Sequence, residues 1–201
     1  LEELKKAENY IFMEYFIIQE GIMWNSILDI LKEKSKQGVD VRLLYDDIGC
    51  FLTLPKDFPE QMRSLGIKCY VFNPFRPFWV SEQNNRDHRK IAVIDGKVAF
   101  TGGINLADEY INAYEKYGHW KDASVMVRGD AAWSFTVFFL QMWALCSKEA
   151  EDFSKFYPWK DEKCSISGDG YVQPYSDSPL DSENVGEHVY LQIIDGAKKY
   201  L

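Results

Sequence analysis

Cysteine is scarce in this sequence, and basic residues are fewer than acidic ones. The 201 residues include four cysteines with no Cys-x-x-Cys spacing, which favours a reduced, cytosolic setting over a disulfide framework. Lysine and arginine number 23 against 31 aspartate and glutamate residues, for a net charge of -8. Because phosphate backbones attract basic surfaces, this balance argues against a nucleic-acid partner, although a local basic pocket stays compatible with it.

Long hydrophobic runs and a secretory signal peptide are also missing. The longest uncharged run, residues 131–147, is shorter than the roughly 18–20 apolar residues that a membrane span needs, and Gln141 interrupts it. We interpret this run as a buried helix, with a helix partly in contact with lipid as the alternative. The hydrophobic fraction of 46% excludes a disordered chain, so we expect a folded protein that is soluble or peripheral to a membrane.

Strands alternate with helices along the chain, which predicts one α/β domain built as an α/β/α layered sandwich. The dipeptide Asp95-Gly96 predicts a tight hairpin, so the central sheet should be mixed rather than wholly parallel. Strands are predicted at 9–18, 39–47, 67–72, 88–96, 97–103, 120–129 and 171–176. Helices are predicted at 1–8, 22–37, 59–65, 106–114, 131–150 and 186–200.

The two ends of the chain resemble each other. Apolar residues, an alanine and a tyrosine recur in one register, as Leu1, Leu4, Ala7 and Tyr10 at the start and Leu191, Ile194, Ala197 and Tyr200 at the finish. A repeat of this spacing predicts that residues 186–201 begin a second copy. We therefore expect residues 1–201 to form the first of two repeats in a longer, duplicated protein.

A histidine and a lysine open the first strand of the hairpin. Residues two apart in a strand point to the same side, so His88 and Lys90 should lie next to each other. Asp95 is seven residues from His88, and the same alternation places it on the opposite side. We expect Asp95 to brace the turn rather than to meet a substrate.

An anion pocket is predicted beside this pair. Gly102 and Gly103 permit a close backbone approach, and Asn105 supplies an amide donor. Together with Lys90 these groups suit a phosphate better than a carbonyl, and His88 would then attack phosphorus as a nucleophile. The alternative from the residues alone is a solvated surface pair without chemistry.

The segment "HRKIAVID" resembles the His-x-Lys-x4-Asp motif of the phospholipase D superfamily, with His88, Lys90 and Asp95 in the motif positions. The family's following glycines and asparagine have counterparts in the predicted pocket. The longer run "DHRKIAVIDGKVAFTGGINLADEY", followed by "YGHWKDASVMVRGDAAWSFTVFFLQMW", is similar to the bacterial cardiolipin synthases of that superfamily. The resemblance covers nearly the whole chain.

The resemblance implies a mechanism without a metal or another cofactor. His88 would attack a phosphodiester and form a phosphohistidine, while Lys90, Asn105, Gly102 and Gly103 bind the phosphate oxygens, where negative charge grows. Asp122 matches the acidic residue that the family places behind the nucleophile, where it would hold the correct imidazole tautomer. The histidine of a second motif would protonate the leaving alcohol.

The sequence departs from the family in having a single motif. His119 is followed by Lys121, but Met126 stands where the motif requires an aspartate, and His188 is followed two residues later by Tyr190. Neither therefore belongs to a second complete motif, and we expect His119 to be a structural or surface residue. The missing half, or a second copy of this chain in a homodimer, would have to supply the general acid.

We therefore expect the N-terminal catalytic half of a cardiolipin synthase, acting on phosphatidylglycerol at the cytoplasmic face of a bacterial membrane. It would transfer a phosphatidyl group from one phosphatidylglycerol to another and release glycerol. A phospholipase D-like hydrolase is the first alternative and a dimeric nuclease of the superfamily the second. A non-catalytic lipid-binding half is the alternative from another class.

Three further features each admit two interpretations. Glu14, an acid within an apolar strand, lines the site or pairs with a basic side chain; we favour the site. The pair Asp46-Asp47 caps a strand end or imitates a metal site; we favour the cap. An aromatic cluster in the loop before His88 contacts the bilayer or forms a small core of its own. Its members are Phe72, Phe75, Phe78 and Trp79.

Overall fold

The computed structural model describes all residues except 77–80, 161–163, 165, 167, 169 and 178–181. In the described part, six strands form one sheet in the order β3-β2-β1-β4-β5-β6. Strands β1, β2 and β3 are parallel, whereas β4, β5 and β6 each run antiparallel to the preceding neighbour. The strands are β1 Tyr10–Tyr15, β2 Asp40–Asp46, β3 Lys68–Phe72, β4 Ile91–Ile94, β5 Val98–Gly102 and β6 Ser124–Arg128.

Strand β1 is the centre of the sheet, and its sequence explains that position. All six of its residues are buried, as expected of a β-branched and aromatic run that is covered on both faces. It pairs in parallel with β2, where Tyr10 faces Asp40, and antiparallel with β4, where Ile11 faces Ile94. The catalytic candidates therefore precede a strand that is held against the most buried strand of the fold.

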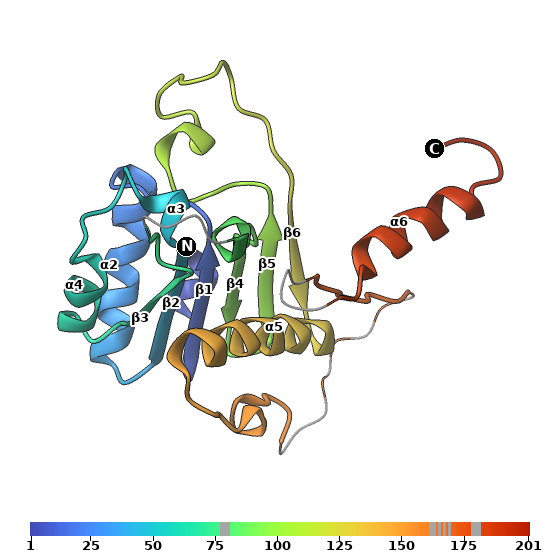
Figure 1. Cartoon of the computed structure of the whole chain (residues 1–201). Helices are drawn as coiled ribbons and strands as arrows, with labels where there is room; N and C mark the ends of the chain where they lie inside the picture. Colours follow the sequence, from blue (N-terminus) through green and yellow to red (C-terminus); the bar gives the residue numbers. More distant parts are fainter. Residues whose placement is uncertain (77–80, 161–163, 165, 167, 169, 178–181) are drawn as a thin grey trace.

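Helices cover both faces of the sheet, which confirms the predicted layered sandwich (Figure 1). Helices α1 (Glu2–Lys5), α2 (Ile22–Lys36) and α4 (Phe58–Ser64) pack on one face, and α5 (Asp130–Ser147) packs on the other. The run at 131–147 is thus a helix with one side in the core, where Phe139 and Leu140 are fully buried. Within the described residues, no helix is long and apolar enough to span the bilayer.

Several predictions about single elements were wrong. The strand β4 begins at Ile91, so His88 and Lys90 lie in the segment just before it. Residues 171–176 form no strand, and residues 106–114 contain only the 3-10 turn Asp108–Ile111. The short helix α3 (Asp47–Cys50) was not predicted. Further 3-10 turns span Ser81–Asn84 and Phe153–Phe156.

The last helix, α6 (Val185–Gly196), projects away from the sheet and has no buried residue (Figure 1). Its exposed side chains include Tyr190, Leu191, Ile193 and Ile194. The proposal that residues 186–201 begin a second repeat stays a prediction.

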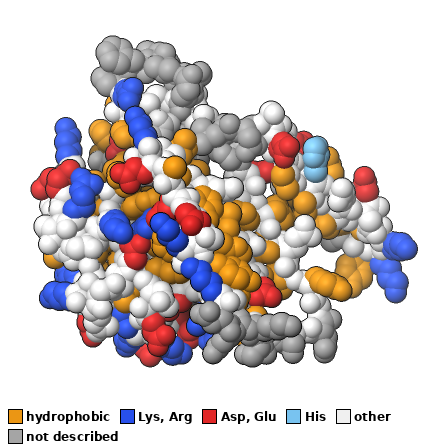
Figure 2. All heavy atoms as spheres, turned by 90° about the horizontal axis from the view of Figure 1, so that it is seen from below, with side chains coloured by type: hydrophobic (Ala, Val, Ile, Leu, Met, Phe, Trp, Pro, Cys, Tyr) orange, Lys and Arg blue, Asp and Glu red, His pale blue; other side chains and the backbone are white. Residues whose placement is uncertain are grey.

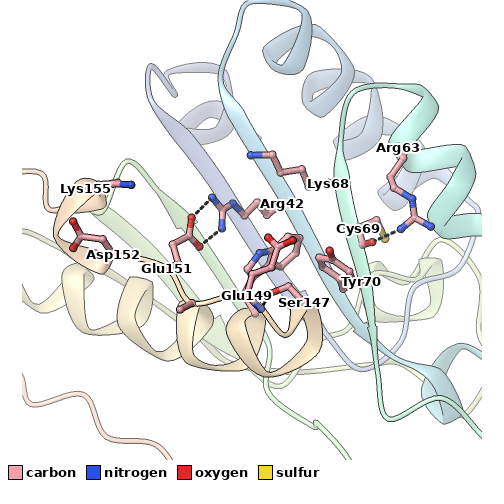
Figure 3. Close-up of a pocket in the computed structure, with 12 residues that line it drawn as sticks. Arg42, Arg63, Lys68, Cys69, Tyr70, Ser147, Glu149, Glu151, Asp152 and Lys155 are labelled. Atoms are coloured by element: carbon pink, nitrogen blue, oxygen red, sulfur yellow. Dashed lines mark hydrogen bonds and ion pairs between the residues drawn. The ribbon is translucent and has the colours of Figure 1, made fainter.

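A salt-bridged pocket of about 340 Å³ lies between β2, β3 and the end of α5 (Figure 3). At its centre the Arg42 guanidinium is bound by Asp40 and by both carboxylate oxygens of Glu151. The ring of Trp143 lies 5.2 Å from the guanidinium carbon and adds a cation–π contact. Because Arg42 has carboxylate partners on both sides, we assign this pocket to the stability of the fold.

Candidate active site

The predicted catalytic pair lies at the edge of the sheet where β1 and β2 end and β4 begins (Figure 1). The Lys90 ammonium nitrogen Nζ is 3.0 Å from the His88 ring nitrogen Nδ1, and it also donates to the His88 carbonyl oxygen. His88 is exposed, whereas Lys90 is buried. An ammonium group only donates, so this contact requires an unprotonated Nδ1 and favours a neutral imidazole.

The surroundings lower the pKa of both side chains. Partial burial, reinforced by the charge of Lys90, lowers the pKa of His88, while Asp87 and Asp46 oppose the shift. Burial lowers the pKa of Lys90 to about 8, with Asp87 again opposing. At neutral pH the pair is therefore a neutral imidazole beside an ammonium that is still mostly charged.

Phe16, which no sequence pattern indicates as a site residue, packs against both groups. Its ring centroid is 4.6 Å from that of His88 and 5.6 Å from the Lys90 ammonium. Gly49 in α3 lies so close to the Phe16 carbonyl oxygen that a side chain there would collide with it. Helix α3 thus fixes the residue that covers the catalytic pair.

Asp46 caps this helix by accepting from the N–H groups of Ile48 and Gly49, which agrees with the interpretation of Asp46-Asp47 as a cap.

Asn105 is buried and held from both ends of its amide. Its oxygen accepts from the Ile17 N–H at 3.0 Å, and its nitrogen donates to the Tyr110 hydroxyl at 3.0 Å. The amide nitrogen carries two hydrogens, so one stays available for a ligand. Ile17 directly follows Phe16, and Asn105 therefore anchors the loop after β5 to the chain segment that covers the catalytic pair.

The two glycines allow β5 and the segment before β6 to approach each other closely. A side chain at Gly102 would collide with Ser124, and one at Gly103 would collide with the carboxylate of Asp122. The Gly103 N–H points to the Ala123 carbonyl oxygen at 3.4 Å. It contributes to phosphate binding only if this long hydrogen bond opens.

Asp122 is exposed and near the site but is not bonded to the histidine. Its carboxylate accepts from the Trp120 indole N–H at 3.0 Å and from the Ala123 N–H at 2.7 Å. These hydrogen bonds and the nearby Lys90 lower its pKa. Among the described residues no hydrogen bond joins Asp122 to His88, so its role behind the nucleophile stays a prediction.

Asp95 lies at the far end of β4. Its carboxylate accepts three backbone hydrogen bonds, from Glu8, Asn9 and Tyr10, at 2.7 to 2.8 Å. The structure thus separates Asp95 from His88, and it uses this motif residue to hold the chain at the start of β1.

Glu14 is fully buried and pairs with a basic side chain, the second of its two predicted roles. Its Oε1 accepts from Arg89 Nε at 2.6 Å. Arg89 stands between the two catalytic candidates in sequence and also donates to Ser176 at 3.0 Å. A segment from the C-terminal part of the chain therefore reaches the site, which the sequence did not indicate.

His88 and Lys90 line a cavity of about 450 Å³. Its polar wall comes from the segment before β4, and its apolar wall from Phe135, Phe138 and Met142 of α5. Lys90 also borders an apolar groove of about 450 Å³ on the α2 side of the sheet. The ammonium thus lies where a charged group and hydrocarbon chains could both be accommodated.

In the aromatic loop, Phe72 is buried against α5, and Phe75 is half exposed beside Phe51, with ring centroids 5.8 Å apart. Phe78 and Trp79 lie outside the described residues. The interpretation of this loop as a bilayer contact stays a prediction.

Solved structures show the same fold. NucT from Helicobacter pylori superposes with a TM-score of 0.52 at 14% sequence identity, covering 72% of this chain and 85% of that one. Phosphatidylserine synthase from Haemophilus influenzae gives a TM-score of 0.54 at 18% identity, covering 77% of this chain and 37% of that one. At such identities the likeness defines the phospholipase D-like fold and carries no function.

Sequence comparison identifies the family. Residues 1–143 match the family described as "Cardiolipin synthase, PLD-like domain". The chain belongs to this family of phospholipase D-like domains, as its motif predicted.

Relatives align over almost all of the chain. An uncharacterized protein of Streptococcus mutans is 51% identical over 100% of this chain and 43% of its own length. A cardiolipin synthase of Alkalihalophilus pseudofirmus and cardiolipin synthase 2 of Bacillus cereus are each 37% identical over 99% of this chain, which covers 39% and 38% of their lengths. The chain therefore spans about two fifths of the relatives that it matches.

Proposed function

We propose that this chain is the N-terminal catalytic half of a cardiolipin synthase, which transfers a phosphatidyl group between two phosphatidylglycerol molecules. The observation that carries the proposal is the neutral His88 held 3.0 Å from the Lys90 ammonium in a cavity with one polar and one apolar wall. Membership of the family and relatives named cardiolipin synthase support the choice of lipid.

In the first step a ring nitrogen of His88 attacks the phosphorus of one phosphatidylglycerol. An N–P bond forms, the P–O bond to the glycerol headgroup breaks, and glycerol leaves with a proton from a general acid. Lys90 donates to His88 and would transfer this hydrogen bond to a phosphate oxygen, which frees the ring nitrogen beside the phosphorus. The free N–H of Asn105 would add a second donor.

In the second step the headgroup hydroxyl of another phosphatidylglycerol attacks the phosphohistidine. A P–O bond forms, the N–P bond breaks, the hydroxyl proton returns to the general acid, and cardiolipin leaves. Asp122 would orient the imidazole after a small movement, and Asp95 supports the site from the far end of β4. No metal or other cofactor enters these steps.

The general acid must come from elsewhere, because the sequence has one complete His-x-Lys-x4-Asp motif. We propose that a second motif in the same protein, or a second copy of this chain, supplies it. We also place the complete protein at the cytoplasmic face of the bacterial membrane, where its lipid substrate is found.

Alternative activities are a hydrolase, which uses water as the acceptor, a nuclease and a non-catalytic lipid-binding half. On the face drawn in Figure 2, acidic and basic side chains are interspersed around a strip of hydrophobic side chains. This face is opposite the end of the sheet where β4 begins, so the choice of substrate rests on the net charge of -8, which favours a lipid over a nucleic acid. The intact His88–Lys90 pair favours catalysis over binding alone.

The test is a product assay with the full-length protein on vesicles of phosphatidylglycerol, read by mass spectrometry. We expect cardiolipin and glycerol, lost in His88→Ala and retained in His119→Ala, which removes an exposed histidine from the loop before β6. Phosphatidic acid without cardiolipin would establish the hydrolase instead. Undiminished turnover in His88→Ala would contradict the mechanism.

A further inference from the structure

A cluster of three charged side chains, two of them buried carboxyl groups, adjoins the catalytic pair. Glu14 comes from the middle of the sheet, and Asp87 and Arg89 flank His88 in sequence. The side chains of Glu14 and Asp87 are 0% and 2% exposed. Arg89 Nε is 2.6 Å from Glu14 Oε1 and 3.5 Å from Asp87 Oδ1. Two carboxyl groups thus share one guanidinium in the interior.

The hydrogen bonds of these carboxyl groups are incomplete. Glu14 Oε2 and Asp87 Oδ2 are both buried and have no donor, although each group's other oxygen contacts Arg89. A buried acceptor without a donor is strongly unfavourable, and so is a second uncompensated charge. One proton between these two oxygens would satisfy both acceptors and reduce the charge of the two carboxyl groups to that of one, which Arg89 balances.

The other ionisable groups around the cluster leave the two carboxyl oxygens without a donor, and Arg89 Nη2 and Arg86 Nε are themselves buried without an acceptor. On one side Arg86 is paired with Asp46 at 3.1 Å. From α5, burial raises the pKa of the Cys146 thiol to about 12, so it stays neutral. On the solvent side Lys90 is engaged with His88.

We propose that Glu14 and Asp87 hold one proton between them at neutral pH and that this carboxyl pair positions His88. The proton lies on Glu14 Oε2 and is donated to Asp87 Oδ2, while Glu14 Oε1 keeps the hydrogen bond from Arg89. Burial and the nearby Asp87 raise the pKa of Glu14 well above its usual value, which supports this assignment.

The consequence for the site rests on the proposed phosphatidyl transfer. A second negative charge beneath His88 would favour its protonated form, which has no lone pair for attack. It would also push Asp87 and Glu14 apart, and Asp87 directly precedes the nucleophile. The shared proton therefore keeps the imidazole neutral and its backbone fixed.

Glu14→Gln tests the pair, because its amide can donate to Asp87 Oδ2 and accept from Arg89 as the protonated acid does. Folded wild type binds one proton more than unfolded wild type between the unfolded pKa of Glu14 and its raised folded pKa. In that window its unfolding equilibrium constant rises by about tenfold per pH unit relative to Glu14→Gln. We expect the unfolding equilibrium constant of the wild type, divided by that of Glu14→Gln, to increase from about pH 5 upwards. Denaturant unfolding of the full-length protein measures both constants.

Glu109→Gln is the matched control. Glu109 is also a buried glutamate, but hydrogen bonds from Lys116 and Tyr114 outweigh the effect of burial and lower its pKa. Its folded-state pKa lies below that of an unfolded glutamate, so the ratio of the unfolding equilibrium constants of wild type and Glu109→Gln should fall with rising pH at acidic pH and stay constant above about pH 6.

Infrared difference spectroscopy supplies a readout that does not depend on activity. The wild type should show the carbonyl stretch of a protonated buried carboxyl at neutral pH. Glu14→Gln should lose it, and so should Asp87→Asn, in which the introduced amide would donate to an ionised Glu14. A flat unfolding ratio, or no such band in the wild type, would overturn the proposal.

The catalytic consequence is tested separately by the pH profile of product formation. The comparison is made in the Lys90→Arg background, where Lys90 no longer sets the alkaline limb. There, activity with Glu14→Gln should persist to higher pH than activity with Glu14, because the variant cannot acquire the second charge that pushes Asp87 and the backbone of His88 away. Identical alkaline limbs would refute the positioning role. If no phosphatidyl transfer occurs at any pH, the proposed function fails, while the unfolding and infrared experiments still decide whether the proton is shared.

Discussion

Lys90 carries its charge in a buried position beside the proposed nucleophile. It is buried, yet it lies beside the imidazole at the position where a phosphate would bring negative charge. Burial makes the ammonium easier to deprotonate, and contact with Phe16 partly compensates through a cation–π interaction. The activity should therefore report the protonation of this one residue.

We predict that turnover of the full-length protein falls as the pH rises through about 8, the pKa of Lys90. Lys90→Arg should turn over more slowly, since a guanidinium has a different shape, but it should keep its activity to higher pH because arginine stays charged. Lys90→Met should lower turnover by roughly 10²–10³-fold, as expected for the loss of one charge-stabilising donor. Initial rates on phosphatidylglycerol vesicles at several pH values measure these effects. A common alkaline midpoint for wild type and Lys90→Arg would exclude Lys90 as the titrating group.

Asp95 is predicted to matter for stability more than for phosphate binding. In Asp95→Asn, one of the three backbone N–H groups would face an amide N–H instead of a carboxylate oxygen. We expect a loss of about 1–3 kcal/mol in the free energy of unfolding, measured by denaturant titration. Phosphate binding should be unchanged. Unchanged melting together with lost phosphate binding would show that Asp95 belongs to the pocket.

The structure places His88 and Lys90 together and Asp95 apart, but both catalytic candidates precede β4, so alternation along a strand does not explain their contact. It did not predict that Arg89, the residue between them, turns inward to Glu14 at 2.6 Å. That contact joins residues 75 positions apart, and a local pattern holds no information about it. Phe16 was missed for the same reason, since its place over His88 depends on the packing of α3.

At the scale of elements, the Arg42 cluster shows how the chain after α5 is attached to the sheet (Figure 3). Glu151 follows this helix, and its two oxygens accept from the Arg42 guanidinium of β2. The same guanidinium lies 5.0 Å from the ring centroids of Phe12 and Phe156. One arginine thus links three segments that are distant in sequence.

We predict that Glu151→Gln destabilises the fold by about 1–3 kcal/mol, because it leaves a buried guanidinium with one carboxylate instead of two. Glu149→Gln is the control, since Glu149 is an exposed residue of the same segment. It should change the free energy of unfolding by no more than about 0.5 kcal/mol. Thermal or denaturant unfolding distinguishes the two variants. Equal effects would contradict a stabilising role of the Arg42–Glu151 ion pair.

Most elements were predictable because their signals are local. The helix α2 follows the spacing of its apolar residues, and the β4–β5 hairpin follows Asp95-Gly96, whose two residues both have positive φ. The four-residue α3 is too short for a periodic signal and depends on its Asp46 cap. Residues 171–176 carry strand-forming side chains, but the sheet already ends at β6, and this segment lies near Arg89 instead.

At the scale of the molecule, the chain has one catalytic pair, whereas the proposed reaction requires two histidines. We predict that any transfer activity of the 201-residue chain alone depends on association of two copies. Its specific activity should rise with protein concentration in parallel with the dimer fraction measured by sedimentation. Full activity in a sample that sedimentation shows to be monomeric would contradict the need for a second histidine.

The position of β1 at the centre of the sheet has a consequence for synthesis on the ribosome. One of its neighbours in the sheet, β2, is synthesised soon after it, but the other, β4, is synthesised much later. The hydrogen bond from the Tyr10 N–H to the Asp95 carboxylate joins residues 85 positions apart. At about 5–20 residues per second, the chain needs roughly 4 to 17 seconds to close that gap. Throughout this interval the nascent chain carries an apolar strand with one unpaired edge, which is a target for chaperones. The segment that bears the catalytic pair is also the one that ends this exposure.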